Sequence, residues 1–486
     1  MSRITFPFPA PEHLSIMVPE IFIAILAMAI LLWGLFLPRG RSDGAAWAAA
    51  AGCAAAIPMV LSQAGAIGLT TFYGFFILDP FAVYAKLILI LSTLFAIVIS
   101  IDYMRREEHA CEYYALMLFA LLGMMFMISA TNFVMMYLGV ELMALAVYVL
   151  VAYQRELLRS PEAALKYFIL GSLSSGMMLY GMSFLYGISG HLDFQAVGIA
   201  LQGVEQGRFA MQLGMLFVLI GLGFKLSIAP FHMWTPDAYE GAPTPVTAFM
   251  SIAPKVAGFA LFIRFLIEAM PPLSTDYIAV LEWLAVLTMA VGNIAAIAQR
   301  NIKRMLAYST IGHVGFVLLG VIAANADGYA GVLTYMTIYL FMNMGAFAII
   351  TMMRRDGFEG ELIEDYAGMA RVRPVYALAM GLLMFSLAGI PFLGGFWAKY
   401  AVFLAAVEAG HLRLALIALL FSVVGAFYYL RVVKRIYFDQ PKGDFVLQEC
   451  NSMQVVVAVS TLMVVLLGLF PGPLMALCHQ ALTGLI

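Results

Sequence analysis

The chain has 486 residues, of which 64% are hydrophobic and 11% are charged. Ordinary soluble domains carry about 25% charged residues, so this composition nearly excludes a soluble enzyme. The 26 Lys and Arg residues almost balance the 28 Asp and Glu residues, and the net charge of −2 does not predict a surface for nucleic acid. A bilayer core about 30 Å thick needs about 20 apolar residues per helix, so the chain is long enough for about fourteen transmembrane spans.

Fourteen apolar segments follow one another along the chain and predict an all-α polytopic membrane protein. Proline follows Asp79, Ser160 and Arg373 at the start of three segments, where its missing N–H costs no hydrogen bond. No basic n-region precedes the first segment, so we expect a membrane helix there and not a cleaved signal. The segments are 16–37, 46–68, 80–101, 113–130, 132–153, 162–188, 211–236, 244–269, 276–299, 303–324, 328–353, 374–408, 411–437 and 452–478.

The Lys and Arg residues in the loops, counted together with those near the adjoining segment ends, are distributed unevenly. The odd-numbered loops hold 17 of them and the even-numbered loops hold two, Arg208 and Arg413. Because cytoplasmic loops are enriched in Lys and Arg, this split predicts that the odd loops face the cytoplasm and that both termini lie on the other side. Apart from Arg3, six cations are not counted with the loops and lie inside predicted spans: Lys86, Lys166, Lys225, Lys255, Arg264 and Lys399.

Two of these lysines lie beside prolines that break helices. A lysine at the centre of a membrane helix costs roughly 2.5–3.5 kcal/mol unless it faces a partner or water. Lys225 precedes Pro230, and Lys399 follows Pro391. Broken helices at membrane depth are tolerated where they line a cavity, so both lysines have a plausible wet environment. We interpret them as functional groups in preference to members of structural ion pairs.

Other charged residues inside the spans have alternative interpretations. Glu141 is the only charge in its span and is either a functional acid, a neutral carboxyl group or the structural partner of a lysine. Lys166 and Lys255 are placed nearer predicted helix ends, where a lysine can reach the interface. His313 is either functional or a hydrogen-bonded core histidine.

Four further charges carry no functional interpretation. Lys86 and Glu20 are expected to reach the membrane interface, and Arg264 is expected to extend from a helix end toward water. Glu282 has no assigned role.

The spacing of these features suggests an internal repeat. Pro230 and Pro391 lie 161 residues apart in the similar strings LSIAPF and LAGIPF, and Lys225 and Lys399 lie 174 apart. Two five-helix units follow, spans four to eight and nine to thirteen, and an odd number of helices per unit makes the repeat inverted. The predicted parts are 1–112, with three helices, 113–270 for the first repeat, 271–437 for the second, and 438–486 with the last helix.

A row of buried lysines can carry protons. Burial disfavours the charged form of a lysine, so the group can release its proton, and a nearby carboxylate favours the charged form again. At an effective dielectric constant of about 20, a unit charge 4 Å away contributes about 4 kcal/mol. Movement of Glu141 relative to Lys166 or Lys225 is therefore a possible switch.

The sequence contains no motif that predicts a cofactor. It lacks GxGxxG, GxxxxGK[ST] and HExxH. Cys53, Cys111, Cys450 and Cys478 include no CxxC pair for zinc or an iron–sulfur cluster. We therefore expect no cofactor or metal in this chain.

Three stretches together resemble the antiporter-like membrane subunits of proton-pumping NADH:quinone oxidoreductase, respiratory complex I. They are GFKLSIAPFHMWTPDAYEGAPTPVTAFMSIAPKVAGF, QRNIKRMLAYSTIGHVGFVLLG and SLAGIPFLGGFWAKYAVF. The resemblance implies a fourteen-helix fold with inverted repeats and broken helices seven and twelve. It also implies roles in proton translocation for Glu141 on helix five, Lys166 on helix six, Lys225 on helix seven, Lys255 on helix eight, His313 as a central histidine and Lys399 on helix twelve.

The same resemblance predicts the setting of the protein. FMN, iron–sulfur clusters and quinone are expected in other subunits, and the partners are other membrane-arm subunits, including further antiporter-like ones, in a bacterial cytoplasmic membrane. The largest relatives continue into a long lateral helix, whereas this chain ends at Ile486, so a shorter member is expected.

Three alternatives to this interpretation stay open at the level of sequence. A subunit of a multisubunit sodium/proton antiporter and a subunit of an energy-converting hydrogenase would share the fold and the lysines. A purely structural scaffold would tolerate neutral residues in place of them. The small residues Gly171, Ser172, Ser174, Ser175 and Gly176 predict close helix packing, either with another subunit or within the chain.

Overall fold

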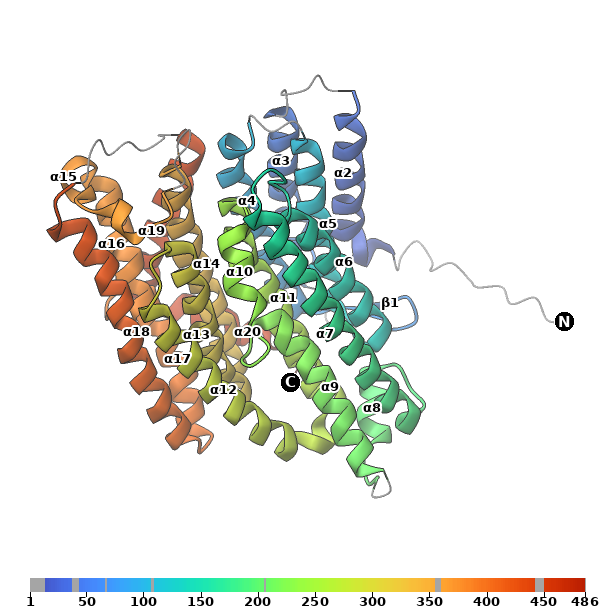
Figure 1. Ribbon diagram of the computed structural model, residues 1–486. Coiled ribbons are helices and arrows are strands. Elements are labelled where there is room, and N and C mark those ends of the chain that lie inside the picture. The colour runs from blue at the N-terminus through green and yellow to red at the C-terminus, as the bar shows by residue number, and fades with distance from the viewer. Residues whose placement is uncertain are drawn as a thin grey trace.

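The structure is a computed structural model that describes residues 14–36, 43–65, 68–105, 109–204, 207–354, 360–441 and 450–485. These residues form a bundle of long helices, with α2 at one side and α16 and α18 at the opposite side (Figure 1). Five of the loop cations counted above lie outside the described residues: Arg39, Arg41, Arg106, Arg355 and Lys442.

The first part of the chain contains three long helices, a short hairpin and the five spans of the first predicted repeat, which the structure divides into seven helices. The elements are η1 (Ser15–Met17), α2 (Val18–Gly34), α3 (Asp43–Leu61), β1 (Leu69–Thr71), β2 (Phe76–Leu78), α4 (Pro80–Tyr103), α5 (Ala110–Ser129), α6 (Phe133–Val151), α7 (Arg159–Ser189), α8 (Phe194–Ala200), α9 (Arg208–Leu226), α10 (Trp234–Gly241) and α11 (Thr244–Ala269). Strands β1 and β2 pair antiparallel, with Leu69 opposite Leu78.

The second part contains the helices of the second predicted repeat and two C-terminal helices. The elements are η2 (Pro271–Leu273), α12 (Ser274–Ile297), α13 (Ile302–Ile322), α14 (Ala326–Met352), η3 (Ile363–Tyr366), α15 (Met369–Val372), α16 (Pro374–Ala388), α17 (Gly394–Glu408), α18 (Leu412–Phe438), α19 (Asn451–Leu469) and α20 (Gly472–Ala481).

The fourteen predicted spans all correspond to helices. Among the described residues, thirteen helical segments are long and apolar enough to cross a membrane, and the pair α16 and α17 accounts for the remaining predicted span. The last span is shorter than predicted because α19 ends at Leu469, ahead of Pro471, and α20 begins as a separate helix at Gly472. Hairpin β1–β2 and the short helix α8 were not predicted.

Helices seven and twelve are broken, as the two prolines predicted. Helix α9 ends at Leu226, and the next residue, Ser227, has a φ of 68°. Helix α16 ends at Ala388, before Gly389 with a φ of 91°. Both left-handed residues end the regular hydrogen bonding of a helix and leave backbone carbonyls free near its last turn. Whether the two five-helix units are inverted copies stays a prediction.

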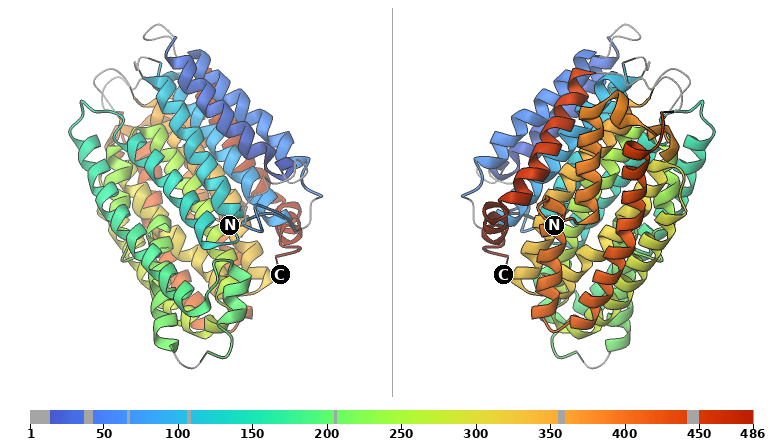
Figure 2. Two further views of the ribbon diagram at one scale, coloured as in Figure 1. Left: turned by 90° about the vertical axis from the view of Figure 1, so that its right-hand side faces the viewer. Right: turned by 90° about the vertical axis from the view of Figure 1, so that its left-hand side faces the viewer.

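The centre of the bundle is formed by α11, α13 and α14. Helix α11 is buried along its whole membrane-spanning window, and α13 and α14 are buried along nearly all of theirs. The two side views in Figure 2 show the long helices of the bundle running side by side. Outer helices such as α7 and α18 carry exposed Leu, Val and Phe side chains, among them Leu173, Leu419 and Phe427, which suit a lipid or protein neighbour.

The expectation that Lys86 and Glu20 reach the interface is wrong. Lys86 Nζ lies 2.7 Å from Glu20 Oε1, and the two side chains are 0% and 1% exposed. The Phe76 ring of β2 lies 4.6 Å from the Lys86 ammonium group. Removing one partner of such a buried pair leaves the other charge uncompensated, which costs about 3–5 kcal/mol. The pair therefore joins α2 to α4.

Arg264 does not extend to water either. Its guanidinium is fully buried and donates to both carboxylate oxygens of Asp79, at 3.0 and 2.8 Å, and to Glu268 at 3.1 Å. Asp79 also caps α4 by accepting a hydrogen bond from the backbone N–H of Ala82. Asp79, which accepts two of these hydrogen bonds, lies 185 residues away in the sequence, so the position of Arg264 near a helix end gave the wrong prediction.

Candidate functional site

A lysine from α11 binds the break between α9 and α10. Lys255 Nζ donates to Ser227 Oγ at 2.7 Å and to the backbone carbonyl of Lys225 at 3.2 Å. In an unbroken helix that carbonyl would accept from Ala229, but the Ala229 N–H donates instead to Thr288 Oγ1 at 3.0 Å. The negative end of the helix dipole adds to the attraction for the ammonium group.

Lys255 is not near a helix end, contrary to the sequence prediction. It lies in the middle of α11 with no exposed surface. An interfacial role is therefore excluded for this side chain. Lys255 and Ser227 instead meet at the break itself.

Lys225 lies on the last turn of α9 and is 2% exposed. Its ammonium group donates to the Tyr148 hydroxyl of α6 at 3.3 Å. Gly171 of α7 leaves room for that hydroxyl, since a Cβ at Gly171 would lie 1.9 Å from the Tyr148 oxygen. Glu141 lies seven residues before Tyr148 on α6, and residues at this spacing share one face of a helix. Within the described residues Glu141 forms no direct ion pair.

Lys166 belongs to a separate, charged cluster. Its side chain is 49% exposed and pairs with Glu162 at 2.9 Å and with Asp237 of α10 at 3.1 Å. Arg304 of α13 binds the same Asp237 at 2.7 Å and Glu240 at 2.8 Å. These groups line a polar cavity of about 230 Å³. The structure thus places Lys166 with Asp237, and not with Glu141.

Glu361, which the sequence analysis did not identify, binds Arg159, another residue that lines this cavity. It lies in the loop after α14 and accepts from Arg159 at 2.7 and 3.1 Å and from Lys303 at 3.1 Å. Burial alone would raise the pKa of Glu361, but Lys303 and Arg159 outweigh it and hold the pKa below its ordinary value. The loop sequence gave no signal, because an acid in a polar loop usually faces solvent.

His313 lies at the centre of α13 and is 3% exposed. Its Nδ1 is 2.5 Å from the Tyr335 hydroxyl and its Nε2 is 2.8 Å from the Tyr429 hydroxyl. Tyr429 is also hydrogen-bonded to Ser309. Both ring nitrogens therefore have partners that can donate or accept a proton.

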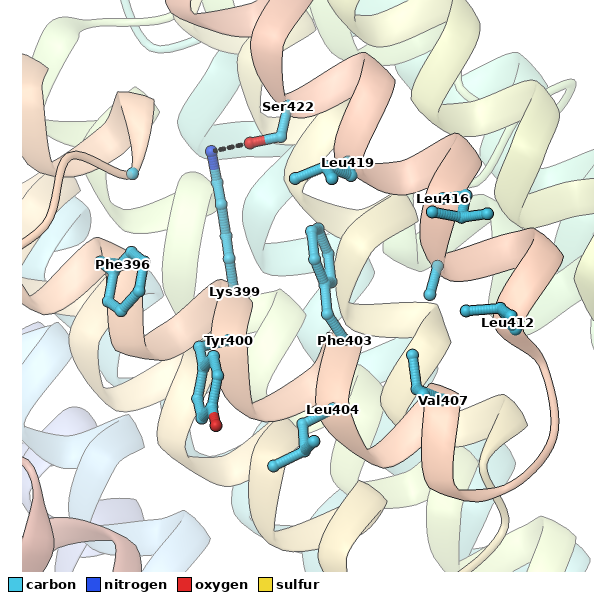
Figure 3. A pocket seen from close by; sticks show the side chains of 12 residues that line it. Phe396, Lys399, Tyr400, Phe403, Leu404, Val407, Leu412, Leu416, Leu419 and Ser422 are labelled. Atoms are coloured by element: carbon cyan, nitrogen blue, oxygen red, sulfur yellow. Dashed lines mark hydrogen bonds between the residues drawn. The ribbon is translucent and has the colours of Figure 1, made fainter.

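Lys399 binds the second break in the same manner as Lys255 binds the first. Its Nζ donates to the carbonyl of Ala388, the last residue of α16, at 2.8 Å, and to Ser422 Oγ of α18 at 3.0 Å. In Figure 3 the lysine extends from α17 toward Ser422, at one side of an otherwise apolar cavity of about 370 Å³ between α17 and α18. Gly389 permits the close approach, since a Cβ there would lie 3.1 Å from Lys399 Nζ.

The three central lysines are Lys225, Lys255 and Lys399, and they share one kind of environment. Within the described residues none of them forms an ion pair with a carboxylate, and each ammonium group is held by neutral oxygen atoms. A hydroxyl group can accept from the ammonium form and donate to the neutral amine, so either protonation state finds a partner. Such sites are suited to proton exchange.

The remaining candidates from the sequence are structural or unassigned. Of the small-residue run, Gly171, Ser174 and Ser175 face inward and pack α7 within the chain, while Ser172 and Gly176 are exposed. Glu282 of α12 binds His411 Nδ1 at 2.6 Å. Within the described residues no group of three His, Cys, Asp or Glu side chains is placed to hold a metal ion.

Long apolar helices, two broken spans and lysines bound at the breaks define an antiporter-like membrane protein. The family model described as NADH:quinone oxidoreductase/Mrp antiporter, TM, matches residues 130–425. The NADH-quinone oxidoreductase subunit N of Paramagnetospirillum magneticum is 45% identical over 95% of this chain and 96% of its own length. That of Thioalkalivibrio sulfidiphilus is 44% identical over 98% of this chain and 99% of its own.

Solved structures similar to this chain support the same family. A chain of respiratory complex I from Thermus thermophilus with bound aureothin is 32% identical, with a TM-score of 0.82 and coverage of 95% of this chain and 100% of that chain. A chain of the Mrp complex from Dietzia sp. DQ12-45-1b has a TM-score of 0.85 at 20% identity, over 97% of each chain, and shares the fold alone. The chain belongs to the NADH-quinone oxidoreductase subunit N family. The predicted fold class and the predicted function, a proton-translocating membrane subunit of that enzyme, are thereby confirmed at the level of the family.

Proposed function

We propose that the chain carries protons across the membrane arm of an NADH:quinone oxidoreductase through a row of buried side chains. The observation that carries this proposal is that at both broken helices an ammonium group binds a freed carbonyl and a serine hydroxyl. The row comprises Lys225, Lys255, His313 and Lys399, with Lys166 at the charged end and Glu141 as a modulator.

The three central lysines act as proton carriers because, within the described residues, no carboxylate pairs directly with them. A buried ammonium group without a carboxylate partner is poorly stabilised, so it gives up its proton when an acceptor comes within reach. The amine that remains keeps a hydrogen bond from its hydroxyl partner, Ser227 for Lys255 and Ser422 for Lys399. A carboxylate close to an ammonium group favours the protonated form, so a change in the separation of Glu141 and Lys225 would shift the proton between neighbouring sites.

The redox chemistry belongs to other subunits in this proposal. FMN, iron–sulfur clusters and quinone are bound elsewhere in the complex, and this chain supplies no redox site. Its partners are the other membrane-arm subunits, further antiporter-like ones among them. The assembly lies in a bacterial cytoplasmic membrane, with both termini of this chain on the non-cytoplasmic side, as the distribution of Lys and Arg in the loops supports.

Replacement of Lys225 by methionine tests the proposed function. The complex is extracted in mild detergent with its partner subunits, reconstituted into vesicles, and supplied with NADH and quinone. We expect Lys225→Met to lower the number of protons moved per NADH, and the exposed Lys434→Met control to leave it unchanged. Pumping by Lys225→Met at the level of the unmodified complex would contradict the proposal. Sodium-dependent proton exchange that needs no NADH would identify an antiporter instead.

A further inference from the structure

A pair of stacked aromatic rings joins α7 and α10, the two helices whose Lys166 and Asp237 line the charged cavity. The rings of Tyr167 on α7 and Trp234 on α10 lie 4.0 Å apart and only 7° from parallel. Both side chains are buried, at 2% and 1% exposure. Stacked aromatic rings at this distance leave no space for water between them.

Trp234 contacts the lysine sites directly. Its indole N–H donates to the Phe224 carbonyl, in the last turn of α9, at 2.9 Å. The Lys255 ammonium group lies 4.9 Å from the centre of the indole ring. Tyr167 extends the contact toward the other lysine, because its ring meets Tyr148 edge-on at 4.6 Å and Tyr148 accepts from Lys225.

The same two helices are held together by an ion pair one layer farther out. Lys166 precedes Tyr167 on α7, and Asp237 follows Trp234 by three residues on α10. The Lys166–Asp237 pair, with Arg304 also bound to Asp237, lines the polar cavity. Three residues of helix correspond to about 4.5 Å, so the ion pair lies one layer outside the ring pair.

Resting on the proposed function, we propose that the Tyr167–Trp234 stack is a water gate between the charged cavity and the Lys225–Lys255 site, and that the ion pairs of Asp237 keep it closed. The polar cavity is large enough for several water molecules and has charged partners for them. Displacement of α10 from α7 would part the rings and connect this water to the lysines. Tyr167 and Trp234 are positioning residues, because they control access and carry no proton themselves.

Chemical labelling of the break tests the gate without any need for pumping. Ser227→Cys introduces a thiol beside Lys255, and inverted membrane vesicles containing the whole complex are treated with a small cationic methanethiosulfonate. The labelled residue is located by mass spectrometry. Because Trp234→Ala leaves a large space in the barrier, we expect labelling to be about tenfold faster in that background. Asp237→Asn, which weakens the ion pairs, should speed it by about threefold.

Two controls keep the test decisive. Trp283→Ala removes an indole that is 79% exposed on α12 and should leave the labelling rate unchanged. Trp234→Phe keeps a ring to stack on Tyr167, so its labelling rate should stay close to that of the parent and far below that of Trp234→Ala. The gate would be overturned if all four variants were labelled at the same rate as the parent that carries Ser227→Cys alone. Faster labelling in Trp283→Ala would overturn it as well.

The outcomes separate the gate from the proposed function. If Lys225→Met pumps normally, the proton route is wrong whatever the labelling shows. If Lys225→Met loses pumping while Trp234→Ala leaves the thiol as protected as before, only the gate is overturned.

Discussion

Replacement of Lys255 by methionine removes one ammonium group from the first break and keeps a long unbranched side chain. The lost bonds are the two to Ser227 and to the Lys225 carbonyl. Leaving that carbonyl without a donor costs about 1–3 kcal/mol. Removing a buried charge recovers a desolvation penalty of several kcal/mol, so the variant should fold and assemble.

The cost to proton transfer is larger than the cost to folding. Each hydrogen bond from a charged group contributes about 1.5–3 kcal/mol to holding a proton at this position. Without the ammonium group, the free-energy barrier to proton transfer rises by at least the energy of one such hydrogen bond. This slows proton transfer by about ten- to a hundredfold. The assay is NADH-driven acidification of vesicles that contain the reconstituted complex, with electron transfer to quinone measured in parallel.

A matched control removes another fully buried lysine from the same chain. The double variant Glu20→Gln with Lys86→Met neutralises both members of the α2–α4 pair. We expect this control to pump normally and Lys255→Met to pump far less, with both complexes intact by detergent extraction. Normal pumping by Lys255→Met, or equal losses in the two variants, would refute the reasoning.

Three further substitutions test smaller parts of the site. Gly171→Ala would place a Cβ 1.9 Å from the Tyr148 oxygen and so displace the hydroxyl that binds Lys225. Loss of this hydrogen bond should slow pumping by about fivefold in the vesicle assay. An unaltered rate would show that the bond lies outside the proton route. In the folded protein the pKa of Glu361 lies below its ordinary value of 4.5, so the ionised carboxylate stabilises the fold at pH values above 4.5. This stabilisation is lost as the pH falls through the pKa of the folded state. Melting temperatures between pH 7 and 3 should therefore drop with acid in the parent complex and less in Glu361→Gln, and parallel curves would contradict the assignment. Gly389→Ala at a φ of 91° presses on Lys399 and should destabilise the complex by about 1–3 kcal/mol in denaturant titration, whereas equal stability would exclude strain.

The fold was predictable because membrane helices follow composition. Runs of apolar residues marked every long helix, and Pro230 and Pro391 marked the two breaks. These are local properties of the chain. Hairpin β1–β2 and the separate helix α20 were not predicted, because short elements carry too few residues for a periodic signal.

The partners of the charged residues were harder to predict. Lys225 and Lys399 were found from prolines close to them in sequence. Arg264, in contrast, is neutralised by Asp79, which lies 185 residues away, and Glu361 binds Arg159 at a separation of 202. No local pattern reports such distant pairs. The depth of Lys255 was misjudged for the same reason, since its binding site is a break in another helix.

The central claim is that the lysines at the two breaks pass protons along one route. Its most direct test is the number of protons moved per NADH oxidised by the reconstituted complex carrying Lys225→Met and Lys399→Met together. We predict that this ratio falls well below that of the unmodified complex, while the partner subunits remain bound and NADH still reduces quinone. An unchanged ratio would show that the chain supports the complex without carrying its protons.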